Sequence, residues 1–334
     1  MLIRPTPSGL YCEQGDFYID PKRKVNRAVI THAHSDHARR GSEKYLCSKS
    51  SEPLLRLRLG KSIFIQALEY GISTSICGVI ISFHPAGHIL GSAQVRIAYK
   101  GEVWVVSGDY KTYPDPTCAP FEPLSCHTFI SECTFGYPIY RWPDPNHEWN
   151  RLENWWKTNR EAGLSSVINA YSLGKAQRIL NALKDSEQTV LVHSAILSFL
   201  PFYISEGVLF PKVMEATPEN IIRYRDQALI ISPPSSRMEK SLGDSCSWQS
   251  LDVSGWNQIR SQKRKKNLPN GLIVSDHADW EGLCQAIQAT EAEQTFLTHG
   301  DGSVLSRWLT EKGLSVSQLP ENISTASLHA SQIH

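Results

Sequence analysis

The segment 32–37 reads His-Ala-His-Ser-Asp-His and so carries three imidazoles and one carboxylate within six residues. Neutral imidazole nitrogen and carboxylate oxygen are the usual ligands of divalent transition metals. Donors packed this densely would otherwise compete for hydrogen bonds and repel one another when protonated. We therefore interpret the segment as one half of a two-metal site rather than as a group of surface histidines.

The elements around this segment predict how it is held. A short β-branched stretch at 27–31 precedes it and predicts a buried strand, and residues 36–40 are expected to begin a helix. Three more donors follow apolar stretches: His88 after 79–83, Asp109 at the end of 104–109 and His299 at the end of 296–299. Each alone is equally consistent with ordinary turn chemistry. Together they supply the His, Asp and His that two metals need beyond the first four donors.

The order of these motifs resembles the metallo-β-lactamase superfamily. Three further segments resemble motifs A, B and C of its β-CASP nuclease branch: Ser131-Glu132-Cys-Thr-Phe-Gly136, Ser275-Asp-His277-Ala-Asp279 and Thr298-His299-Gly300. Within the branch, the segments 253–256 and 272–280 resemble bacterial ligase-associated DNA exonucleases, which are similar to the nuclease of mRNA 3′-end processing factors. A histidine in motif C is typical of the RNA-processing type, so the sequence leaves DNA and RNA open as substrates.

The resemblance implies an α/β fold, namely an αββα sandwich with an inserted cap domain of parallel sheet and helices. It also implies two divalent ions, zinc or manganese, which would share one carboxylate. The implied metal ligands are His32, His34 and His88 for one ion and Asp36, His37 and His299 for the other, with Asp109 shared.

The resemblance also implies the catalytic roles. A hydroxide held between the two ions attacks the phosphodiester, His277 protonates the departing oxygen, and Glu132 holds the His277 ring and favours its charged form. Asp36 counts as both a ligand and a catalytic residue. Asp20 is expected to orient a ligand histidine through the second ring nitrogen of that histidine.

These expectations together predict a DNA nuclease, acting on single strands or ends in DNA repair, with an ATP-dependent DNA ligase and a helicase as partners by resemblance. The alternatives are a β-CASP ribonuclease and a catalytically silent β-CASP scaffold, although a scaffold is expected to have lost ligands. A β-lactamase or thioesterase of the same fold would need neither the cap nor Glu132 and His277.

Composition limits the remaining function classes. The chain has 334 residues, is 41% hydrophobic and 20% charged, and carries a net charge of only +1, so nucleic acid must bind at local patches. No stretch approaches the roughly 20 apolar residues that cross a bilayer, and the first residues lack the apolar core of a signal peptide. The eight cysteines form no C-x-x-C pair, which favours a reducing cytoplasm over a zinc ribbon or a disulfide scaffold.

Changes in pattern predict the domain organisation. Residues 1–140 are mostly β and form the first part of the metallo-β-lactamase domain, with a hairpin turn at Lys100-Gly101. Residues 141–270 alternate helix and strand and form the cap, residues 271–318 return to the first domain, and residues 319–334 form a loose tail.

Basic residues in the cap are the candidate contacts to nucleic acid. Lys175 opens a predicted helix whose N-terminus is suited either to a bound phosphate or to plain capping. The dense basic cluster is equally consistent with a solvated loop and with nucleic-acid binding; it consists of Arg260, Lys263, Arg264, Lys265 and Lys266. Most of the tryptophans at 142, 149, 155 and 156 are expected to pack in a core rather than stack on bases.

Overall fold

The computed structural model divides the chain into two compact units. The structure describes residues 1–236, 238, 247–259 and 271–319. The first unit contains residues 1–114, 118–137 and the chain from Trp280 onward, and the second contains Asp115–Thr117 and Pro138–Asp279.

The segment 271–279 belongs to the compact second unit, whereas the sequence predicted a return to the first domain at residue 271. Two interactions explain this. Leu272 pairs with Val253 in an isolated parallel bridge, and the Ile273 N–H donates to the Glu148 carboxylate at 2.8 Å. The identity of the second unit as a cap stays a prediction.

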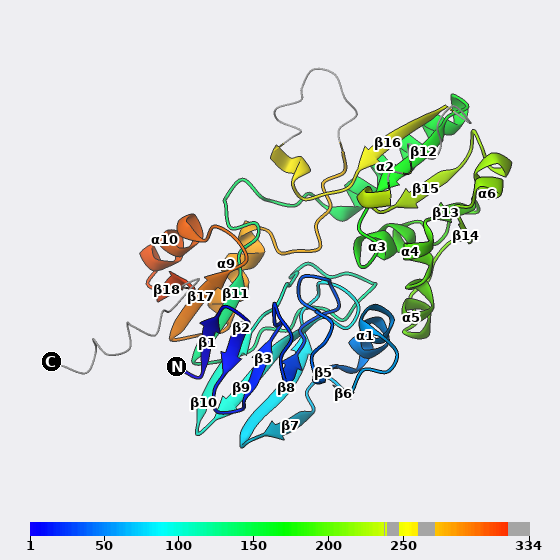
Figure 1. Cartoon of the computed structure of the whole chain (residues 1–334). Coiled ribbons are helices and arrows are strands. Elements are labelled where there is room, and N and C mark those ends of the chain that lie inside the picture. The colour runs from blue at the N-terminus through cyan, green and yellow to red at the C-terminus, as the bar shows by residue number, and fades with distance from the viewer. Residues whose placement is uncertain (237, 239–246, 260–270, 320–334) are drawn as a thin grey trace. The chain divides into compact units, whose positions relative to one another are not determined.

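The first unit contains two β-sheets, shown in Figure 1 with the blue strands β1–β3 against the cyan strands β8–β10. The six-stranded sheet has the order β1-β2-β3-β4-β5-β6, with β1 Ile3–Thr6, β2 Gly9–Cys12, β3 Phe17–Ile19, β4 Arg27–Val29, β5 Lys44–Ser48 and β6 Ile65–Leu68. The seven-stranded sheet has the order β18-β17-β11-β10-β9-β8-β7, with β7 Ser73–Ile76, β8 Val79–Pro85, β9 Ala93–Tyr99, β10 Glu102–Val106, β11 Thr128–Glu132, β17 Gln294–Thr298 and β18 Val316–Gln318.

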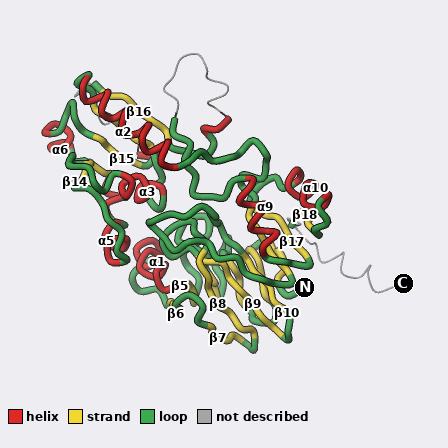
Figure 2. The backbone as a smooth tube through the Cα atoms, turned by 180° about the vertical axis from the view of Figure 1, so that it is seen from behind, coloured by secondary structure: helices red, strands yellow, loops and turns green. Residues whose placement is uncertain are grey.

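One hydrophobic core joins the two sheets, because alternate side chains of each strand point to the same face. Phe17 and Ile19 of β3 belong to the same buried cluster as Phe83 of β8 and Val95 of β9. Three helices flank the sheets, namely α1 Glu52–Leu59, α9 Trp280–Ala289 and α10 Ser303–Glu311. Figure 2 shows α9 and α10 beside β17 and β18. Two short 3₁₀ turns, η1 and η2, cover Lys49–Ser51 in this unit and Pro234–Ser236 in the other.

Two local predictions for the first unit have different outcomes. The predicted hairpin turn is confirmed, since Lys100 and Gly101 adopt φ of 50° and 88° between the antiparallel strands β9 and β10. The helix expected from residue 36 is wrong, because only a single turn forms there. The Tyr45 hydroxyl accepts from Ser42 N–H and donates to the Arg39 carbonyl, which fixes residues 39–42 in a turn instead.

Strand direction brings the predicted ligands to one edge of the sheets. β8 and β10 both run antiparallel to β9, and β10, β11 and β17 are parallel, so these four strands end at the same edge. β3 and β4 of the other sheet are also parallel. The Ala93 N–H donates to the Thr31 carbonyl at 2.8 Å and thereby ties the two sheets together beside His32.

The second unit contains a parallel five-stranded sheet of order β14-β13-β15-β12-β16. Its strands are β12 Ser165–Asn169, β13 Val190–Val192, β14 Val213–Glu215, β15 Leu229–Ser232 and β16 Trp248–Asp252. Its helices are α2 Pro145–Glu161, α3 Lys175–Ala182, α4 Ser194–Leu197, α5 Leu200–Ser205 and α6 Pro218–Arg223. The predicted alternation of helix and strand is therefore present, and the chain is an α/β protein with mixed and parallel sheets. None of the helices within the described ranges has the length and apolarity that a bilayer crossing requires.

Candidate metal centre

Four of the predicted ligands form one donor set at this edge of the first unit. His32, His34, His88 and Asp109 each offer an atom within 4.8 Å of the others. The His88 Nε2 lies 3.1 Å from the His34 Nδ1 and 3.7 Å from the Asp109 Oδ2, and the His32 Nε2 lies 3.5 Å from that same oxygen. Two imidazoles thus face one carboxylate oxygen, and the third, that of His34, lies beside His88.

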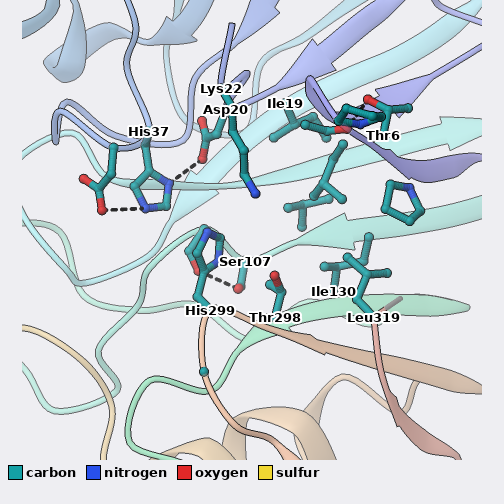
Figure 3. Close-up of a pocket in the computed structure, with 18 of the residues that line it drawn as sticks. Thr6, Ile19, Asp20, Lys22, His37, Ser107, Ile130, Thr298, His299 and Leu319 are labelled. Atoms are coloured by element: carbon teal, nitrogen blue, oxygen red, sulfur yellow. Dashed lines mark hydrogen bonds and ion pairs between the residues drawn. The ribbon is translucent and has the colours of Figure 1, made fainter. Parts of the chain in front are cut away.

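A second donor set lies on the other side of Asp109. The His37 Nε2 is 3.4 Å from the Asp109 Oδ1 and 3.8 Å from the Asp36 Oδ2. The His299 ring lies 5.1 Å from the His37 ring, and Figure 3 shows both rings at one wall of a cavity. The two oxygens of Asp109 therefore face different histidines, as a shared ligand requires.

One buried atom tests whether these residues fit a metal. The His32 Nε2 is fully buried and has no hydrogen-bond partner among the described residues. An unsatisfied buried polar atom costs about 1–3 kcal/mol. A divalent cation would satisfy this nitrogen, and the imidazole and carboxylate donors around it are those that zinc and manganese accept. The set formed by His32, His34, His88 and Asp109 therefore fits such an ion.

Asp20 orients His37 within the second set. Its Oδ1 accepts the Thr31 N–H at 2.8 Å, and its Oδ2 accepts the Thr31 hydroxyl at 2.5 Å and the His37 Nδ1–H at 2.7 Å. Because the His37 Nδ1 donates its proton to Asp20, its Nε2, which lies beside Asp109, is the nitrogen left to bind a metal. His32 also has its Nδ1 beside the Thr31 hydroxyl, at 3.0 Å.

Two glycines permit the close backbone approaches in the site. Gly108 has φ of 58°, and a Cβ there would lie 2.6 Å from the Thr31 Cβ, so glycine lets the chain before Asp109 pass the residue before His32. Gly87 has φ of 73°, and a Cβ there would lie 2.3 Å from the Lys111 carbonyl oxygen. A side chain at either position would separate the strand ends that carry the donors.

The pKa values of two neighbouring histidines move in opposite directions. Burial, together with the charge of His37, lowers the pKa of His32 well below its ordinary value. Burial also acts to lower the pKa of His37, but the carboxylates of Asp109 and Asp20 outweigh it and raise that pKa well above its ordinary value. Without metal, the proton of the pair therefore resides on His37.

Glu132 ends β11 in the first unit and is buried. Its Oε1 accepts the Tyr110 N–H at 2.8 Å, and its Oε2 accepts the Thr134 hydroxyl at 2.5 Å. Register pairing of Glu132 with Thr298 makes the end of β11 a neighbour of His299. His277 lies in the second unit, so its pairing with Glu132 stays a prediction.

The loop that carries His277 is anchored within the second unit. The Trp142 Nε1–H donates to the His277 carbonyl at 2.9 Å, and the His277 N–H donates to the Ser275 hydroxyl at 3.1 Å. Arg178 donates from Nη1 to the Ser275 carbonyl at 2.6 Å, and its Nε lies 3.0 Å from the buried Asp115 carboxylate. Arg178 carries no signal in the sequence, because no motif surrounds it on α3.

The predicted nucleic-acid contacts are described only in part. Lys175 is buried, with its ammonium 3.6 Å from the Asp276 carboxylate and 5.2 Å from the Tyr171 ring centre. Its contact with nucleic acid stays a prediction. Arg260 and the run Lys263–Lys266 lie outside the described residues. Trp156 is buried in the core of the second unit, and Trp149 and Trp155 pack against that core.

Several known proteins are similar to this chain in sequence. The chain is 28% identical to a protein named probable DNA ligase from Opitutus terrae, over 94% of this chain and 31% of the relative. It is 26% identical to the transcription termination factor FttA of Methanosarcina mazei, over 59% of this chain and 36% of the relative. It is also 26% identical to the ribonuclease TTHA0252 of Thermus thermophilus, over 62% of this chain and 52% of the relative. The chain thus spans about a third to a half of the length of these relatives.

A solved structure has a similar fold. The crystal structure of a protein of unknown function from Enterococcus faecalis matches with a TM-score of 0.61 and 13% identity, over 89% of this chain and 80% of that chain. No protein-family model matches the chain. The relatives include β-CASP nucleases of the metallo-β-lactamase superfamily, and the resemblance predicted from the sequence is confirmed.

Proposed function

We propose that the chain is a metal-dependent nuclease that hydrolyses phosphodiester bonds of DNA, with the first unit as a metallo-β-lactamase αββα sandwich and the second as a β-CASP cap. The observation that carries this proposal is the position of Asp109, whose two oxygens face two separate donor sets at 3.4–3.7 Å. A carboxylate in this position suits two ions that act on one phosphate.

The side chains have distinct roles in this proposal. His32, His34 and His88 would hold one divalent ion and Asp36, His37 and His299 the other, with Asp109 shared. When bound, the two ions supply water activation and neutralise charge on the phosphate. Asp20 holds the His37 ring through Nδ1, at 2.7 Å. His277, kept protonated by Glu132, gives its proton to the departing oxygen.

DNA is the favoured substrate because the match to the relative named DNA ligase extends over more of the chain than the match to the ribonuclease. The relative named DNA ligase covers 94% of this chain, whereas the ribonuclease covers 62%. The same match supports action beside a DNA ligase, and our proposal adds ATP dependence of that ligase, a helicase partner and repair of DNA ends in the cytoplasm. The name of the Thermus thermophilus relative supports the second candidate, a ribonuclease. A silent scaffold has less support, because the predicted ligand set is intact.

Two variants of the full chain test the catalytic assignments. Asp109→Ala is expected to lose bound metal and activity together. His277→Ala is expected to keep its metal and to lose activity by about 100-fold or more, since a general acid contributes about 10²–10⁴-fold. Metal content is measured by elemental analysis and cleavage on labelled oligonucleotides. His147→Ala, which alters an exposed histidine of the second unit, is the control. Wild-type turnover of His277→Ala would refute the acid assignment.

The substrate assignment is tested on single-stranded DNA and RNA of the same sequence. Only contacts to the 2′-hydroxyl distinguish these substrates at one site. We expect cleavage of DNA, and cleavage restricted to RNA would replace the DNA proposal with the ribonuclease. Zinc and manganese are compared in the same assay, because both suit an imidazole- and oxygen-rich site.

A further inference from the structure

A cavity of about 670 Å³ lies beside the second donor set, within the first unit (Figure 3). Asp36, His37 and His299 line one part of it. Apolar side chains of both sheets line another part; they are Leu10, Ile19, Val106, Ile130 and Leu319. Since Ile19 and Ile130 are fully buried members of the core between the sheets, the cavity ends on that core.

Two cations line the cavity without partners of their own. Lys22 and Arg39 are exposed residues, and in the part of the chain that the structure describes neither side chain has a hydrogen bond or an ion pair. Figure 3 shows the Lys22 ammonium extending toward the space in front of His299. Ammonium and guanidinium groups are the usual side-chain partners of phosphate, and here they stand next to an apolar surface.

The neutral polar side chains of the cavity wall, apart from the Thr298 hydroxyl, are hydrogen-bonded to the backbone. The Thr6 hydroxyl donates to the Gly9 carbonyl at 2.8 Å, and the Ser107 hydroxyl donates to the Gly108 carbonyl at 2.6 Å. The Gln318 amide donates to the Gly300 carbonyl and accepts the Gly302 N–H, both at 3.1 Å. These groups are therefore not available to read the edge of a base.

We propose that this cavity is a subsite for one nucleotide of the substrate, an inference that rests on the proposed nuclease function. Lys22 and Arg39 hold a phosphate, and the base and sugar lie against the apolar side chains of Leu10 and Leu319. The volume is within the range of about 300–1,000 Å³ typical of small-molecule sites and exceeds what a phosphate alone needs. Because the neutral polar side chains other than Thr298 are committed, and a hydroxyl can either donate or accept, the subsite accepts different bases with similar affinity.

Calorimetric binding to the full chain, metal-free and again with manganese restored, tests the subsite. The probes are dAMP, dTMP, inorganic phosphate and deoxyadenosine. We expect dAMP to bind at least tenfold more tightly than inorganic phosphate and than deoxyadenosine, and dTMP to bind within about threefold of dAMP. Equal binding of dAMP and inorganic phosphate would overturn the proposal, because the apolar wall would then contribute nothing.

Variants separate the two halves of the subsite. Lys22→Met is expected to weaken dAMP binding about tenfold and to leave deoxyadenosine unchanged, and Lys22→Arg is expected to restore binding. Lys61→Met, at an exposed lysine outside the cavity, is the matched control. Leu10→Trp, which fills the cavity, is expected to reduce dAMP affinity to that of phosphate. If Leu10→Trp does not fold, the Lys22 series still decides the outcome.

Failure of the subsite proposal can be distinguished from failure of the proposed nuclease function. A chain that cleaves nucleic acid but binds dAMP no better than phosphate, with Lys22→Met unchanged, refutes the subsite alone. A chain that cleaves neither DNA nor RNA but binds dAMP as expected refutes the nuclease proposal and keeps a nucleotide site. Cleavage and binding are therefore scored on the same preparations.

Discussion

Replacement of Asp20 by asparagine is expected to impair metal binding without moving the backbone. Asp20 has φ of 43°, a conformation that asparagine also adopts readily, so the substitution adds no backbone strain. The Thr31 N–H faces Oδ1, so the asparagine oxygen must occupy that position. The amide NH₂ then takes the place of Oδ2, which now accepts the His37 Nδ1–H at 2.7 Å.

That exchange reverses the protonation of His37. An NH₂ group only donates, so the His37 Nδ1 must become the acceptor, and the one proton of the neutral ring then sits on Nε2. The Nε2 atom is the one that lies 3.4 Å from Asp109, and with a proton attached it cannot bind a metal. The opposite amide orientation places NH₂ against the buried Thr31 N–H and leaves two donors facing each other. Either outcome costs about 1–3 kcal/mol.

This free energy corresponds to a loss of metal affinity of about 10- to 100-fold, which is the usual cost of removing such a supporting carboxylate. The assay is competition for Zn²⁺ with a chromophoric chelator at neutral pH, on full-length protein whose fold is checked by circular dichroism. Asp16→Asn is the matched control, because Asp16 is exposed and also has positive φ, at 48°. A wild-type dissociation constant for Asp20→Asn, or an equal loss in Asp16→Asn, would show that the reasoning about the His37 proton is wrong.

Two further predictions concern buried charges. Arg178→Met leaves the Asp115 carboxylate buried without its 3.0 Å partner, so we expect the second unit to lose about 3–5 kcal/mol of stability. Hydrogen exchange of the sheet amides in that unit measures this loss. The added substitution Asp115→Leu should restore only the part that is due to the unpaired charge, because it also removes the bonds from Thr117 to Asp115. The pKa of His37 is raised by Asp109 and Asp20 despite burial, so its proton is bound at neutral pH and a metal must displace it. The zinc affinity is therefore expected to rise with pH above 6.5 until the raised pKa of His37 is passed. Calorimetry in buffers of different ionisation enthalpy should detect the proton that His37 releases. Zinc binding without proton release would contradict the assigned protonation of His37.

The parts of the structure that the sequence predicted are those with strong local or chemical constraints. The 32–37 segment is recognisable because few functions other than metal binding need that density of imidazole, and the structure brings its histidines together with His88, Asp109 and His299. The hairpin at Lys100-Gly101 depends on two residues that adopt positive φ.

Other features depend on contacts between distant segments, which a single sequence does not reveal. The turn after residue 36 is fixed by the Tyr45 hydroxyl, which lies beyond any helix-capping signal. The Arg178 contacts join residues that are 97 positions apart in one case. The cavity beside His299 exists because Leu10 of one sheet and Leu319 beside the other contribute to the same wall.

The position of β17 has a consequence for biosynthesis. This strand pairs with β11 and β18 and ends one residue before His299, yet it begins at Gln294, after the entire second unit in chain order. A nascent chain on the ribosome therefore holds the 32–37 segment, His88 and Asp109 long before His299 emerges. On the proposed function, the newly made protein cannot cut nucleic acid near the ribosome until β17 has docked, so the order of translation itself delays a hazardous activity.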